Sequence, residues 1–202
     1  ATTEIYTLSL HDALPICGLG PAVRPVTLRI GEDRSVVMTE KDAANVAILP
    51  AAGAGWDVLD LVGQKDPVRG WYALYGIQPS HDIVYRRRAR LPCHFETVIE
   101  PLPAGEARPM RVEARAVSCR GSQTCAAVAC GDDLFLVSYD GPAEMRCGDV
   151  EFRGTALLLQ RDPAGRPLRA LAVDGAEVLV GGAPLPAGAV ENAPATGQNS
   201  LQ

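Results

Sequence analysis

Short runs of β-forming residues, separated by clusters of turn residues, recur along most of this chain, and no stretch keeps a sustained helical period. Their spacing of ~8–12 residues is typical of a β-sandwich. Only residues 41–48 could form a helical turn. The sequence therefore predicts an all-β fold, an antiparallel β-sandwich. The expected strands cover residues 25–30, 35–38, 56–62, 82–91, 95–101, 110–119, 126–130, 134–139, 144–146, 150–153, 155–161, 167–173 and 176–180.

The two ends of the chain are predicted to lie outside this domain. Back-translation of residues 1–16 gives a string that looks like a common short-read sequencing adapter read in one frame, so we exclude this segment as artefactual. His11 and Asp12 are then no functional pair, and Cys17, whose codon spans the junction, is set aside with them. Residues 185–202 are rich in Pro, Ala and Gly and then polar, which predicts a disordered tail. The domain is expected over residues 17–184.

The charge and hydropathy of the chain argue against two classes of partner. Without residues 1–16 the chain holds 19 basic and 22 acidic residues, a formal charge of −3, which argues against bulk binding of nucleic acid. No apolar run approaches the ~20 residues that a membrane-spanning helix needs. We therefore expect neither a nucleic-acid partner nor a membrane span.

Cysteine and histidine give no sign of a metal site or a cofactor. Five cysteines lie beyond the junction: Cys93, Cys119, Cys125, Cys130 and Cys147. They form no C-x-x-C pair and match no zinc-ribbon spacing. We interpret them as buried thiols that act as small hydrophobic side chains, with a Cys119–Cys130 bridge as the alternative. His81 and His94 have no converging set of further ligands, so we expect no metal and no cofactor.

The run from Asp66 to Gly76 is the most distinctive part of the chain. In D-P-V-R-G-W-Y, Pro67 fixes φ and Gly70 permits a tight turn, which places the indole of Trp71 at the end of a loop. Trp71, Tyr72 and Tyr75 bring three aromatic rings within five residues. They could form a platform for a sugar ring or a contact to another domain. The alternative is that Trp71 plugs one end of the sandwich, because a large aromatic side chain seals much apolar area.

Arginines repeat with a period of two in the expected strand over residues 82–91. Alternation places Arg86, Arg88 and Arg90 on one face, in a basic stripe of about 13 Å. Guanidinium groups present a fork that matches uronate carboxylates or sulfates. The alternative is that these arginines lie on an ordinary solvent-exposed face and form ion pairs with acidic residues of a neighbouring strand. The acids considered for this are Glu96, Glu100, Glu113 and Asp133.

Residues 63–101 resemble the C-terminal β-sandwich of heparinase II/III-like polysaccharide lyases. The resemblance is carried by D-P-x-R-G-W over residues 66–71, then Tyr75-Gly76, an apolar strand with Tyr85, Leu91-Pro92, and Thr97 with Pro101. Two departures stand out: Ala73 replaces a serine that is common after the tryptophan, and the loop into Tyr75 is one residue shorter. The remainder of the chain is compatible with such a domain but carries no further motif.

The resemblance implies a parent enzyme that cleaves a uronate-containing acidic polysaccharide, of the alginate or heparin type, by β-elimination. In that family the catalytic groups come chiefly from an N-terminal helical toroid and from the earlier part of the β region. We therefore expect no catalytic residue in this chain, an inactive fragment, and the toroid as its partner. Export to the periplasm or the medium is common among such enzymes. The alternative is a non-catalytic carbohydrate-binding or structural β-sandwich of a cell-surface protein.

Overall fold

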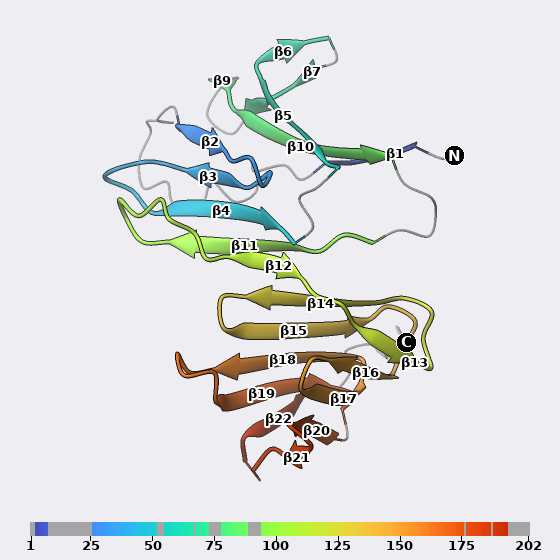
Figure 1. The fold of residues 1–202 in the computed structure, drawn as a ribbon. Helices are drawn as coiled ribbons and strands as arrows, with labels where there is room; N and C mark the ends of the chain where they lie inside the picture. Colours follow the sequence, from blue (N-terminus) through green and yellow to red (C-terminus); the bar gives the residue numbers. More distant parts are fainter. Residues whose placement is uncertain are drawn as a thin grey trace, which may run out of the picture. The chain divides into compact units, whose positions relative to one another are not determined.

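The computed structural model of the chain describes residues 3–7, 26–51, 55–66, 68–72, 78–88, 94–175, 177–186 and 188–193. Every regular element in these ranges is a β-strand, and the strands form several antiparallel sheets, which confirms the predicted all-β class (Figure 1). The chain divides into two compact units, residues 1–109 and 110–202. This boundary falls inside the range 17–184 that the sequence assigned to one domain.

Two sheets build the first unit. One has the order β1 (Thr3–Thr7), β10 (His81–Arg88), β5 (Asp57–Val62), and the other has the order β11 (Thr97–Leu102), β4 (Asn45–Pro50), β3 (Val36–Met38), β2 (Leu28–Ile30). A core cluster joins residues of both sheets: Val36, Ile48, Trp56, Ile83 and Tyr85. The two sheets thus face each other across a common core.

Two small hairpins follow β5 in the chain and precede β10. The first pairs β6 (Gln64–Lys65) with β7 (Val68–Arg69), and the second pairs β8 (Trp71–Tyr72) with β9 (Gln78–Pro79). Together they carry the Trp71 run, and in Figure 1 β6, β7 and β9 lie beyond the end of β5.

The second unit is a β-sandwich. Its larger sheet has the order β12 (Val112–Ala114), β14 (Cys125–Cys130), β15 (Asp133–Ser138), β18 (Ala156–Arg161), β19 (Pro167–Val173), β22 (Val190–Ala193). The smaller sheet has the order β13 (Ser118–Arg120), β16 (Ala143–Cys147), β17 (Val150–Gly154), β20 (Glu177–Val180), β21 (Ala183–Pro184). Leu136, Leu157 and Ala172 of the larger sheet and Met145 and Phe152 of the smaller sheet share one buried cluster. The alternating burial of β15 and β16 produces this core, because every second side chain points inward.

Residues 41–48 form no helix. Residues 41–43 are a bend, and β4 begins at Asn45, whose buried side chain bonds to the backbone of Glu40 and Glu106. Ala47, Ile48 and Leu49 are buried between neighbouring strands β3 and β11. A helix of one or two turns is marginal by itself, so the pairing of β4 on both edges decides the local structure.

Both ends of the chain contain a strand that the sequence did not predict. Thr3–Thr7 pairs antiparallel with β10, and Val190–Ala193 pairs parallel with β19. Residues 190–193 therefore correct the prediction of a disordered tail over 185–202, while residues 194–202 lie outside the described ranges. An open strand edge offers unpaired backbone groups to any extended segment, which accounts for both additions.

The expected strand over residues 110–119 is divided between the two sheets of the sandwich. Val112–Ala114 pairs with β14, whereas Ser118–Arg120 pairs with β16. Cys119 of β13 forms a disulfide with Cys125 of β14, so the interpretation of these two cysteines as buried thiols is wrong, and so is the alternative Cys119–Cys130 bridge. The bridge ties the two sheets together close to the point where the chain changes sheet. Cys147 is a buried thiol whose pKa burial raises, and Cys93 lies outside the described residues.

Candidate functional site

The Trp71 run folds into a tight loop whose backbone depends on Gly70. Gly70 has a φ of +69°, and a Cβ at this position would run into the backbone carbonyl of Leu61. Its carbonyl oxygen accepts hydrogen bonds from the amides of Gly63 and Ser80, at 2.9 Å and 2.8 Å. The loop therefore joins the end of β5 to the start of β10, and it needs glycine there, as the sequence indicated.

The indole of Trp71 is anchored at the surface of the first unit. Its Nε1–H donates to the carbonyl oxygen of Gln64 at 2.6 Å, and Pro79 is its neighbour across the β8–β9 pair. The side chain is half-buried, and the buried tryptophan of the core is Trp56. Trp56, with Tyr85 and Phe95 edge-on to it, takes the sealing role that the sequence left open for Trp71.

Arg69, in the same run, holds the loop in place through an ion pair with Asp82 of β10. Arg69 Nε donates to Asp82 Oδ2 at 2.8 Å, and the Asp82 side chain is only 7% exposed. An ion pair with so little solvent around the carboxylate is far less screened than a surface pair. Arg69 therefore fixes the loop to β10, a structural role that the sequence did not reveal because thirteen residues separate the two groups.

The arginines of β10 lie on both sides of that strand. Arg86 and Arg88 are exposed, and Arg86 Nη2 lies 3.3 Å from Asp57 Oδ2 of β5. The acid that pairs with Arg86 is thus Asp57, which is not one of the four acids considered from the sequence. Arg87 lies on the opposite face, with its guanidinium carbon 5.7 Å from the centroid of the Trp56 ring. This confirms the predicted alternation of the strand.

The predicted contact residues are not gathered into one compact site. Trp71 lies opposite Pro79, before β10 begins, and Arg86 lies seven residues further along, or about 23 Å at the rise of an extended strand. Tyr72 contributes its backbone to β8, and its side chain is not described. Tyr75 and Arg90 lie outside the described residues. An extended ligand could reach both ends of β10, whereas a single sugar could not.

His81 and Tyr85, two side chains that can act as acids or bases, lie between Trp71 and Arg86 along the chain. Both are hydrogen-bonded to other groups of the protein. His81 Nδ1 lies 2.9 Å from both carboxylate oxygens of Asp60, and its Nε2 lies 2.8 Å from the carbonyl oxygen of Val26. Tyr85 is buried and donates its hydroxyl hydrogen to the carbonyl oxygen of Arg34 at 2.9 Å. Burial raises the pKa of Tyr85 well above its usual range, and the charge of Asp33 adds to this. Tyr85 is therefore not placed to exchange a proton with a substrate on the surface, and both ring nitrogens of His81 already have partners within the protein.

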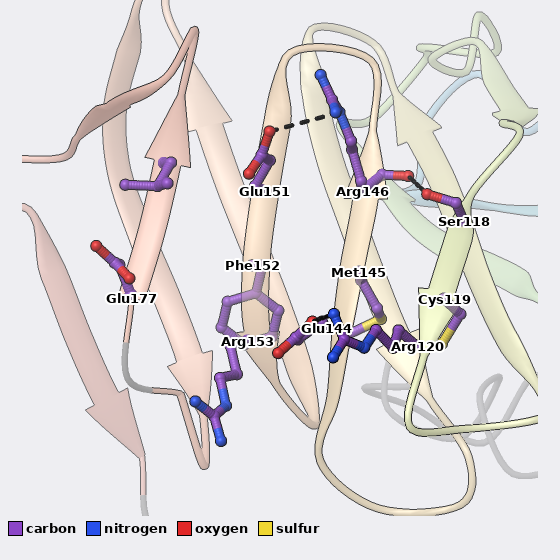
Figure 2. A pocket seen from close by; sticks show the side chains of 11 residues that line it. Ser118, Cys119, Arg120, Glu144, Met145, Arg146, Glu151, Phe152, Arg153 and Glu177 are labelled. Carbon is purple, nitrogen blue, oxygen red and sulfur yellow. Dashed lines mark hydrogen bonds and ion pairs between the residues drawn. The ribbon is translucent and has the colours of Figure 1, made fainter.

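A second candidate lies on the outer face of the smaller sheet of the sandwich. A hollow of about 420 Å³ extends over β13, β16, β17 and β20 (Figure 2). Its charged lining consists of three arginines and three glutamates: Arg120, Arg146, Arg153, Glu144, Glu151 and Glu177. Sequence reasoning missed this hollow. The local signal was the repeat Glu-x-Arg at residues 144–146 and 151–153, but the pairing of the four strands cannot be read from it.

Comparison of the chain with models of protein families, with curated proteins and with solved structures finds no match. Within the described ranges, no group of three or more His, Cys, Asp or Glu side chains is placed to hold a metal ion. The same residues contain no helix that is long and apolar enough to cross a membrane. The geometry of the two candidate surfaces therefore carries the functional argument.

Proposed function

We propose that this chain is the C-terminal accessory part of a polysaccharide lyase that acts by β-elimination on a uronate-containing acidic polysaccharide, and that the chain alone is inactive. The observation that carries the proposal is the anchored, half-buried indole of Trp71 at the end of the D-P-x-R-G-W run. An aromatic face held rigidly at the surface suits stacking on a sugar ring, because little conformational entropy is lost on binding.

The arginines at the far end of β10 support an acidic ligand. Arg86 and Arg88 are exposed, and the ion pair of Arg86 with Asp57 is itself exposed, with side chains 46% and 67% accessible. Such a pair contributes little free energy and can be exchanged for a carboxylate or sulfate of a ligand. A ligand that contacts both ends of β10 would have to extend past residues 82–85, which are buried.

The hydrogen bonds that His81 and Tyr85 make within the protein support an accessory role for this chain. Elimination next to a uronate carboxylate needs a base, an acid and a group that neutralises the carboxylate. We propose that the base and the acid come from other parts of the parent protein, including a helical toroid that would pack against this chain. The sequence of the coding DNA upstream of residue 17 tests this, since it should encode several hundred residues of helical repeats.

Binding of acidic oligosaccharides tests the contact surface. Titration of the chain with hyaluronan, alginate and heparin oligosaccharides should give salt-sensitive binding that Trp71→Ala weakens about tenfold, or ~1.4 kcal/mol. Trp71→Tyr keeps an aromatic ring, so its affinity for the acidic oligosaccharides should stay close to that of the unsubstituted chain. Arg86→Ala with Arg88→Ala should also weaken binding. Arg111→Ala, which removes an exposed arginine of the second unit, serves as the control.

Two binding results would contradict the proposed contact surface: the absence of binding to all three acidic polymers, and equal binding by all four variants. A rise in ultraviolet absorbance from unsaturated product would show that catalytic groups lie within this chain. If the upstream DNA instead encodes a start codon or another β-module, the alternative of a non-catalytic carbohydrate-binding module of a cell-surface protein takes its place.

A further inference from the structure

The hollow on the smaller sheet of the sandwich presents charges of both signs in regular order. By strand register, Arg120, Glu144, Arg153 and Glu177 stand side by side across β13, β16, β17 and β20. A second row holds Ser118, Arg146, Glu151 and Leu179. In the first row, hydrogen-bond donors and acceptors thus alternate at the spacing of neighbouring strands, about 4.8 Å.

The charged groups of the hollow are only loosely tied to each other. Arg120 and Glu144 are 3.6 Å apart, and Arg146 and Glu151 are 3.5 Å apart, with all four side chains well exposed. Arg153 and Glu177 are neighbours in register, yet no ion pair within 4 Å joins them in the described structure, and no dashed line connects them in Figure 2. Exposed pairs of this kind contribute little to stability, so a ligand can replace them at small cost.

The backbone beneath these side chains is held firmly. Met145, Phe152 and Val178 point to the other side of the same strands and are buried in the sandwich core. The Cys119–Cys125 disulfide ties β13, the rim of the hollow, to the opposite sheet. Sites built on strands with a packed reverse side hold their polar groups more precisely than sites on loops.

We propose that this hollow binds a neutral, hydroxyl-rich saccharide. A sugar hydroxyl both donates and accepts, and therefore matches a lining in which carboxylates alternate with guanidinium groups. The formal charges of the lining cancel. The attraction of a polyanion to the three guanidinium groups would be offset by its repulsion from the three carboxylates. The volume falls within the ~300–1,000 Å³ of small-ligand sites. This site is separate from the Trp71 surface and does not rest on the function proposed for it.

Nuclear magnetic resonance with neutral hexasaccharides of glucose, mannose and galactose tests the proposal on the full chain. At least one of them should shift the amide signals of β13, β16, β17 and β20 in a saturable way. Arg153→Ala and Glu144→Gln should each weaken that binding by about tenfold. Thermal unfolding should stay nearly unchanged, because both side chains point away from the core. Arg111→Ala, an exposed arginine outside the hollow, should bind as the parent chain does.

The outcomes separate this proposal from the one for the Trp71 surface. No saturable shift with any neutral hexasaccharide would overturn it, as would shifts that Arg153→Ala and Glu144→Gln leave intact. Binding of hyaluronan oligosaccharides in the hollow in preference to the neutral ones would also overturn it, because the charge argument would then fail. Loss of acidic oligosaccharide binding through Trp71→Ala bears only on the other surface.

Discussion

Gly70 is the residue on which the position of Trp71 depends. Gly70→Ala places a side chain at a φ of +69° and against the Leu61 carbonyl, so we expect a loss of about 3 kcal/mol in the free energy of unfolding. Gly131→Ala is the matched control. Gly131 has a φ of +61° but no neighbouring atom within 4 Å of the added Cβ. This substitution should therefore lower the free energy of unfolding by only about 1 kcal/mol. Urea unfolding of both variants measures the difference, and equal losses would contradict the steric argument.

Single residues of the site were predictable where the signal is local. The need for glycine at residue 70 follows from its place between Arg69 and Trp71 in a turn. The role of Arg69 did not follow, because its partner Asp82 lies in another strand. The same holds for Arg86, whose partner Asp57 is 29 residues away. Contacts between strands depend on register, which two strands and the turn between them set together, so it cannot be read from one segment alone.

Elements on either side of a clear turn signal were predicted well, and other elements were not. The hairpins β14–β15 and β18–β19 match the expected strands closely, since the turn residues at 131–133 and 162–165 separate their β-rich runs. β4 was missed because its buried run Ala47–Leu49 has no alternation. The two-residue strands β6 to β9 are too short to show a period. The change of sheet between β12 and β13 also leaves no mark in an alternating sequence.

Strand β1 allows a direct test of how much an edge strand contributes. Backbone pairing needs no particular side chains, so residues 3–7 can cover the open edge of β10 even if, as the sequence predicts, the segment is artefactual. Deletion of residues 1–16 should change the free energy of unfolding by no more than ~0.5 kcal/mol. It should also leave the β10 edge unpaired and promote self-association, which light scattering after size-exclusion chromatography measures.

Ile5→Pro in the full chain provides the control for this deletion. It removes one backbone donor opposite Arg86 without shortening the chain, and it should promote the same association. A loss of several kcal/mol on deletion would show instead that residues 1–16 are packed as part of the fold.

The chain divides into two compact units, and a disulfide in one of them predicts how they unfold. Among the described residues, each unit has a buried hydrophobic cluster of its own. The second unit is also closed by the Cys119–Cys125 disulfide, a short loop for which chain-entropy arguments give about 2–3 kcal/mol. We therefore expect the first unit to unfold at a lower temperature than the second.

The placement of the two tryptophans makes this prediction measurable. Trp56 and Trp71 are the only tryptophans of the chain, and both belong to the first unit, so fluorescence reports that unit alone, whereas circular dichroism reports all strands. The fluorescence transition should come first, and a reductant should lower only the later dichroism transition. Coincident transitions that a reductant shifts together would show that the two units unfold as one cooperative body, since independent cores cannot share a midpoint under both conditions.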